Sequence, residues 1–292
     1  MKRLIILIAI VACTAISSSA QNRITFQGAD ETVCLWDNST AQYSNYQTKD
    51  EAWRKGKKAV MINTSSFELY IYKADPEKNT GIAVAIYPGG SFTSLHLNSS
   101  IAKWYSSQGI TAAIVKYRLP NGHKEAMLED AMGAVRYLRT RTDLGIDPKK
   151  VGVSGSSAGG CLAAWVSNVM PDDEKPAFAI PLFGSMVRTE FYTTPKANAA
   201  LLGNDFTFEE TMEISVQNMV TPTTPPTLLL LCDDDRVVLP YSSAAYYEAL
   251  LRNGVKASLH IYPNGGHSLK QHDTEYKEAI IDWLDWLNLL NK

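Results

Sequence analysis

A serine flanked by glycines is the feature of this sequence with the clearest capacity for chemistry. The run Gly155-Ser156-Ser157-Ala158-Gly159 matches G-x-S-x-G, and only Ser157 has a glycine two residues away on each side. It follows a short apolar run and opens a helical pattern, which is the strand–turn–helix context of a nucleophile elbow. Such a turn lifts the hydroxyl above the strand end, beside a helix N-terminus that favours developing negative charge. The spacing predicts a nucleophilic Ser157; the plainer alternative is a glycine-rich turn that packs a helix against a strand.

A serine nucleophile needs a base, and three histidines follow it in the chain. His267 comes after a Gly-Gly pair, just beyond an apolar run of strand length, where catalytic groups of open α/β sheets gather. We therefore predict His267 as the base, with His272 as the alternative. His260 lies inside the predicted strand and is expected to pack or to face solvent. Two histidines precede the serine and are interpreted as surface-loop residues: His96 and His123.

The acid that orients the base is expected in the run Asp233-Asp234-Asp235, which follows the apolar residues 227–231 and precedes His267. Three adjacent carboxylates repel, so one should face the histidine while the others face solvent or loop amides. Asp235 is the predicted partner because the apolar residues after it can anchor the loop. Its role would be to orient the imidazole and stabilise its charged form.

A second glycine pair predicts an oxyanion hole. Residues 82–87 form an apolar run that continues into Pro88-Gly89-Gly90-Ser91-Phe92. Glycines after a strand let backbone N–H groups face a ligand, as in HGGG-type loops. The predicted donors are the N–H of Gly90 or Ser91 together with that of Ala158, while Phe92 is a candidate substrate contact. A simple turn is the alternative.

Alternating strand and helix patterns must position these residues. Alternation from about residue 66 to residue 292 predicts one α/β domain with a mostly parallel sheet and helices on both faces. Residues 21–65 form an N-terminal extension packed on that domain, and residues 184–224 form a substrate-facing insertion. Strands are expected at residues 67–72 (as an exposed edge), 82–87, 111–115, 151–154, 178–182, 227–231 and 257–262, and helices at 124–140, 158–170, 241–253 and 274–290.

The first twenty residues have the pattern of a signal peptide. Two basic residues precede the apolar residues 4–12, and Ser18-Ser19-Ala20 offers a cleavage site. We expect export to the periplasm or the medium, with a lipoprotein anchored at Cys13 or an uncleaved anchor as alternatives. No later stretch is apolar enough to span a membrane.

Composition excludes several other classes of protein. The 292 residues include 28 basic and 30 acidic ones, so nucleic acid is not an expected partner. Histidine, cysteine and carboxylate spacing indicates no metal site, and we expect no cofactor. Cys161 and Cys232 are predicted to be buried as small apolar side chains. Arg118 is predicted to pair with a carboxylate such as Asp130.

With these motifs in place, the chain resembles the α/β-hydrolase fold and, more narrowly, the bacterial esterase family that includes acetyl xylan esterases. The motifs that carry the resemblance are Leu35-Trp36, Tyr87-Pro88-Gly89-Gly90, Tyr117-Arg118-Leu119-Pro120, Asp130-Ala131, Gly145-Ile146-Asp147-Pro148, Gly155-Ser156-Ser157-Ala158-Gly159-Gly160, Leu201-Leu202-Gly203, Pro225-Pro226, Asp233-Asp234-Asp235 and Gly265-Gly266-His267. In that family the third aspartate and the last histidine complete the triad, which supports Asp235 and His267. This chain departs from the family in having Ser91 at the third glycine of the loop.

The resemblance implies a serine esterase that removes short acyl groups, acetyl first, from a carbohydrate such as xylan. A serine peptidase of the prolyl-oligopeptidase type shares the fold, but the 45 residues from 21 to 65 are too few for the extra domain such enzymes usually carry. The third alternative is a carbohydrate-binding protein with a non-catalytic hydrolase fold. The polar residues of the insertion favour a hydrated sugar over a long acyl chain.

Overall fold

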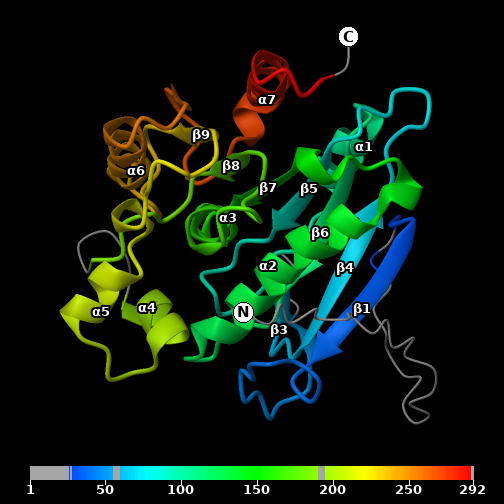
Figure 1. The fold of residues 1–292 in the computed structure, drawn as a ribbon. Helices are drawn as coiled ribbons and strands as arrows, with labels where there is room; N and C mark the ends of the chain where they lie inside the picture. The colour runs from blue at the N-terminus through cyan, green and yellow to red at the C-terminus, as the bar shows by residue number, and fades with distance from the viewer. Residues whose placement is uncertain (1–25, 27, 55–59, 190–194, 291–292) are drawn as a thin grey trace, which may run out of the picture.

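An eight-stranded sheet runs through the centre of the molecule (Figure 1). The computed structural model describes residues 26, 28–54, 60–189 and 195–290, so the predicted signal peptide and Cys13 lie outside the described residues. Across the sheet the strands lie in the order β1 (Glu31–Asp37), β4 (Ser66–Tyr72), β6 (Thr111–Lys116), β5 (Ala83–Tyr87), β7 (Val151–Ser156), β8 (Ala179–Leu182), β9 (Thr227–Cys232) and β10 (Ala257–Tyr262).

The six strands from β6 to β10 are parallel, while β1 and β4 are antiparallel to their neighbours. Parallel strands covered on both faces have continuous apolar sequences. Strand β5 is apolar and buried throughout, and β9 is buried throughout and apolar from Leu228 on. In β5 the side chains still alternate: Ala83, Ala85 and Tyr87 face one core, and Val84 and Ile86 face the other. The carboxyl ends of these strands therefore meet along one edge.

Two helical layers cover the sheet. Helices α2 (Lys124–Thr140), α3 (Ala158–Val169) and α6 (Pro240–Arg252) pack on one face, and α1 (Ser100–Ser107) and α7 (Asp273–Trp286) pack on the other (Figure 1). This arrangement and the mostly parallel sheet confirm the predicted fold class. Among the described residues, no helix is long and apolar enough to cross a membrane.

The strand predicted at residues 67–72 exists, but the prediction that it forms an exposed edge of the sheet is wrong. Strand β4 lies between β1 and β6 and is buried along most of its length, because residues 31–37 of the predicted N-terminal extension pair with it antiparallel. β1 is the edge, and its outward residues Thr32 and Cys34 are exposed. Its mixed polar sequence gave no clear strand pattern. The short helix α1 was not predicted either.

The remaining elements lie outside the main sheet and its covering helices. They are the β2 (Ala52–Arg54) and β3 (Val60–Ile62) ribbon, α4 (Pro195–Leu202), α5 (Phe208–Glu213), and short 3₁₀ turns at Thr142–Leu144, Pro148–Lys150, Val216–Asn218 and Lys270–His272. Helix α5 begins with a capping box in which the side chains of Thr207 and Glu210 each accept from the other's backbone N–H.

Candidate active site

Ser157 occupies a strained turn between β7 and α3. Its backbone has φ 56° and ψ −123°, a conformation that non-glycine residues rarely adopt and that clusters at functional sites. Its N–H donates to the Leu182 carbonyl at 2.9 Å, which ties the turn to β8. A Cβ at Gly159 would overlap the Tyr87 carbonyl, so the helix can approach β5 this closely only with glycine at that position.

His267 lies in the loop after β10 and touches both predicted partners. Its Nε2 lies 2.8 Å from the Ser157 hydroxyl oxygen, and its Nδ1 lies 2.7 Å from Asp235 Oδ2. The ring of Phe183 meets the imidazole edge-on, with 4.9 Å between centroids. Contacts on three sides restrict the imidazole to an orientation in which one nitrogen faces the serine and the other the carboxylate.

Asp235 is the buried member of the aspartate run, with 1% of its surface exposed. Its Oδ1 accepts the N–H groups of Val237 at 2.8 Å and Val238 at 3.0 Å, which leaves Oδ2 for the histidine. Asp234 instead accepts the N–H of Gly266 at 2.7 Å. The structure thus brings Ser157, His267 and Asp235 into one hydrogen-bonded chain, and the neighbouring carboxylate holds the histidine loop.

The other histidines lie elsewhere. His272, the alternative base, has its Nε2 2.7 Å from the Asn264 carbonyl and its ring stacked on Tyr262. His260 makes a 3.0 Å contact with the Ser258 hydroxyl within β10. His123 packs against the Tyr46 ring, and His96 is exposed.

The glycine loop after β5 lies directly beside the serine. A Cβ at Gly89 would lie 2.6 Å from the Ser156 carbonyl oxygen and 3.0 Å from Ser157 Cβ, so only glycine permits this approach. Gly90, Ser91 and Phe92 follow with φ values of 137°, 55° and 60°, and the Gly90 carbonyl accepts N–H groups from the end of the loop. The loop that carries the predicted donors Gly90 and Ser91 thus begins against the Ser157 turn, and Ala158, the third predicted donor, is the first residue of α3.

Phe92, the candidate substrate contact, is 1% exposed and packs against the side chain of Arg188, which is also buried. The guanidinium of Arg188 lies 5.4 Å from its ring centroid, a cation–π distance. Sequence analysis counted Arg188 only among the polar residues of the insertion that would face a hydrated sugar, whereas the structure buries it, and it did not single out Phe183. Neither residue belongs to a recognisable sequence motif. The chain brings both to the site in the segment that follows β8.

Two predictions about supporting residues are confirmed. Cys161 and Cys232 are buried, and burial raises the pKa of each thiol to about 11. Arg118 is fully buried and pairs with Asp130 at 2.7 Å. Among the described residues there is no group of three or more histidine, cysteine or carboxylate side chains placed to hold a metal ion.

Together, the sheet order, the serine turn and the histidine loop define an α/β-hydrolase. Residues 99–290 match the model of the prolyl oligopeptidase family, and the chain belongs to that family. It is 30% identical over 226 residues to an acetylxylan esterase of Xylanibacter ruminicola, covering 73% of this chain and 46% of that protein. It is also 30% identical over 166 residues to the carboxylesterase/phospholipase LipF of Mycobacterium tuberculosis, covering 53% of this chain and 43% of LipF. The chain therefore spans less than half the length of these two relatives.

Solved structures agree in fold. The acetyl ester-xyloside bifunctional hydrolase of Caldicellulosiruptor lactoaceticus superimposes with a TM-score of 0.71 at 29% identity, over 77% of this chain and 90% of that one. A Thermogutta terrifontis esterase matches at 0.64 and 21% identity, over 83% and 96%. The predicted resemblance to acetyl xylan esterases is confirmed.

Proposed function

We propose that the protein is a serine ester hydrolase that removes short acyl groups, acetyl first, from a carbohydrate such as xylan. The observation that carries the proposal is the continuous chain from Ser157 through His267 to Asp235, with contacts of 2.8 and 2.7 Å. The names of the acetylxylan esterase and of the acetyl ester-xyloside hydrolase support the substrate class.

The geometry supports a two-stage reaction. Ser157 Oγ attacks the ester carbonyl and its proton passes to His267 Nε2, which lies 2.8 Å away. The tetrahedral intermediate collapses, the bond to the sugar oxygen breaks, and the imidazolium returns the proton to that oxygen. Water then attacks the acyl-serine with His267 as base, which releases the carboxylic acid and restores the hydroxyl.

Charge develops on the carbonyl oxygen during both stages. The N–H of Ala158 at the start of α3 and those of Gly90 or Ser91 are the donors that we assign to it, and each such donor contributes roughly 3–4 kcal/mol to the transition state. Buried Asp235 stabilises the imidazolium without taking its proton.

Replacement of the serine tests the reaction most directly. Ser157→Ala should lower kcat on para-nitrophenyl acetate by roughly 10⁴- to 10⁶-fold while the circular dichroism spectrum stays unchanged. Ser156→Ala is the matched control, since that neighbour ends β7 and makes none of the contacts of the triad. Substantial residual hydrolysis by Ser157→Ala, or an equal loss in Ser156→Ala, would refute the proposal.

A short acyl pocket is the second part of the proposal. Ser91 and Phe92 follow the glycine pair in the chain, and we expect them to narrow the acyl side of the site, so that kcat/KM falls steadily from acetyl to butyryl to octanoyl esters. Each methylene changes discrimination by about 1–3 kcal/mol at most, so the decline should be graded. A maximum at octanoyl would indicate a lipase-type pocket.

Peptide hydrolysis is the second candidate, because the family match is to prolyl oligopeptidases. The same three residues can attack an amide. Assaying a dipeptide amide beside an acetyl ester separates the two activities, and we expect a clear preference for the ester. A non-catalytic carbohydrate-binding role is the third candidate; labelling of Ser157 by an organophosphonate in folded protein would exclude it.

Export is also proposed, from the pattern of residues 1–20. Amino-terminal sequencing of the protein recovered outside the cytoplasm should begin at Gln21. A lipid-modified Cys13 would instead support the lipoprotein alternative.

A further inference from the structure

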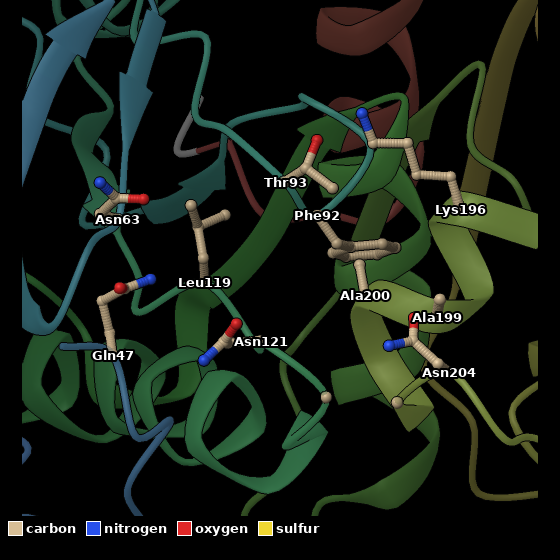
Figure 2. Close-up of a pocket in the computed structure, with 12 residues that line it drawn as sticks. Gln47, Asn63, Phe92, Thr93, Leu119, Asn121, Lys196, Ala199, Ala200 and Asn204 are labelled. Carbon is tan, nitrogen blue, oxygen red and sulfur yellow. The ribbon is translucent and has the colours of Figure 1, made fainter. Parts of the chain in front are cut away.

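A cavity of about 350 Å³ lies beside the glycine loop, and His267 does not line it. Figure 2 shows its lining residues. Its walls come from five separate parts of the chain: the N-terminal extension, the segment after β3, the glycine loop, the segment after β6, and α4 with the residues behind it. The described lining residues are Gln47, Asn63, Phe92, Thr93, Leu119, Asn121, Gly122, Lys196, Ala199, Ala200, Gly203 and Asn204.

The order of the strands places this cavity within reach of the serine. Asn121 follows β6, Phe92 follows β5 and Ser157 ends β7, and these three strands are neighbours. The carboxyl ends of β6 and β7 lie two strand spacings apart, about 10 Å along the sheet edge. Gly89, which precedes Phe92 in the glycine loop, approaches Ser157 directly, so the cavity adjoins the loop beside the serine. A short oligosaccharide that occupies the cavity can therefore present a neighbouring sugar to the serine.

Carboxamides dominate the polar lining. Four of them come from separate segments, and none of the described lining residues is acidic. An amide offers two donors at one end and an acceptor at the other, which suits sugar hydroxyls, since these both donate and accept. The side chains concerned are Gln47, Asn63, Asn121 and Asn204.

Three of these amides are held by one end. Asn63 Nδ2 donates to the Asp50 carbonyl at 3.1 Å, and Asn121 Nδ2 donates to the Asn45 carbonyl at 2.9 Å. Gln47 Oε1 accepts the Lys49 N–H at 2.9 Å. Figure 2 shows the Asn63 oxygen and the Gln47 nitrogen turned toward the middle of the cavity. The free ends are thus pre-positioned for a ligand, which lowers the entropy lost on binding.

We propose that this cavity is a glycan subsite, which binds a sugar unit adjacent to the one that carries the acyl group. The inference rests on the proposed esterase function, and it identifies the surface that binds the polysaccharide beside the reacting ester. Ala199 and Ala200, which are half-buried, offer an apolar surface to the C–H face of the ring, and the amides supply its hydrogen bonds.

Asparagine-to-glycine variants test the subsite without backbone strain. Asn63 and Asn121 have φ values of 58° and 49°, and glycine adopts this region freely while losing the amide. Asn204→Ala removes a third amide, at a residue without a positive φ. Asn288→Gly is the matched control, because Asn288 has φ 57° but lies after α7 and does not line the cavity.

The first readout is the ratio of kcat/KM for acetylated xylotetraose to that for para-nitrophenyl acetate. We expect each cavity variant to lower this ratio about five- to tenfold, mainly through KM for the oligosaccharide, because each loses about one neutral hydrogen bond. Asn288→Gly should leave the ratio unchanged. Cavity variants that leave the ratio unchanged would overturn the inference while the esterase function stands.

The second readout is binding without turnover. Calorimetry should show that unacetylated xylotetraose binds the Ser157→Ala chain. Addition of Asn121→Gly to that chain should raise the Kd about five- to tenfold. This measurement needs no esterase activity, so it separates failure of the subsite from failure of the proposed function.

A larger cavity of about 770 Å³ on the α1 and α7 side of Ser156, lined in part by Asn98, is the competing location. If Asn98→Ala weakens xylotetraose binding and Asn121→Gly does not, the glycan occupies that cavity and the inference is wrong.

Discussion

Two fully buried arginines near the candidate site have very different surroundings. Arg118, after β6, bonds Asp130 at 2.7 Å and Glu129 at 2.8 Å and is 0% exposed. Arg188, after β8, is 1% exposed but has no carboxylate partner among the described residues; its contacts are the Ser185 hydroxyl, the Ala197 carbonyl and the Phe92 ring.

Their pKa values shift in opposite directions for this reason. Burial alone lowers the pKa of a guanidinium, and it does so at Arg188. At Arg118 burial acts the same way, but the bonds to Asp130 and Glu129 outweigh it and raise the pKa. A buried charge with carboxylate partners supports the framework, whereas one with no carboxylate partner among the described residues is retained at the expense of stability. Natural proteins usually keep such a group near a functional site.

Loss of the paired arginine should have the largest effect. Arg118→Ala leaves Asp130 buried without its partner and frees the Asn38 and Tyr43 segment that Arg118 also bonds. We expect the free energy of unfolding to fall by about 3–5 kcal/mol in urea denaturation. The surface variant Arg252→Ala loses only an exposed ion pair with Glu248, so it should change the free energy of unfolding by less than about 1 kcal/mol. Equal effects would remove the distinction between buried and exposed pairs.

The contact of Arg188 with Phe92 should be measurable by a double-mutant cycle. The variants Arg188→Met, Phe92→Leu and their combination should give a coupling of about 1–2 kcal/mol in the free energy of unfolding, since the cation lies over a desolvated ring. Additive losses would mean that the 5.4 Å approach is packing alone.

Removal of Arg188 should separate stability from activity. Arg188→Met should change the free energy of unfolding by less than about 1 kcal/mol, because no carboxylate in the described part of the chain compensates the lost charge. Phe92 loses its contact with Arg188 in this variant and continues the loop that carries the assigned oxyanion donors. We expect these donors to shift and kcat on para-nitrophenyl acetate to fall about tenfold. A loss of 3 kcal/mol or more, comparable to Arg118→Ala, would contradict the comparison.

The smallest effect is expected at the thiol beside Arg188. Burial raises the pKa of Cys161 to about 11, although Arg188 acts to lower it. Folded protein should therefore react with a maleimide at exposed Cys34 and leave Cys161 unmodified at neutral pH. Mass spectrometry of peptides reads this out, and rapid labelling of Cys161 in folded protein would show that Arg188 holds a thiolate.

Sequence reasoning recovered most of the sheet and both covering layers. The strands of the parallel core are uninterrupted apolar runs, and the long helices have a clear apolar face, so their patterns are strong. Strand β1 was missed because an edge strand needs only one buried face, and its register depends on β4, whose residues pair with it from Asp37–Ser66 to Glu31–Ile71, far apart in the sequence. Helix α1 was missed because its eight residues are too few for a reliable period.

By itself, the sequence determined the local chemistry of this protein. The turns at Ser157 and Gly89 require glycines, so neighbouring residues in the sequence define them. The order of serine, aspartate and histidine is likewise read directly from the chain. Only the tertiary structure decided which distant side chains meet. The contact of His267 with Ser157 joins residues 110 apart, and the burial of Phe92 under Arg188 joins two loops. These contacts depend on strand order and packing, which no local pattern encodes.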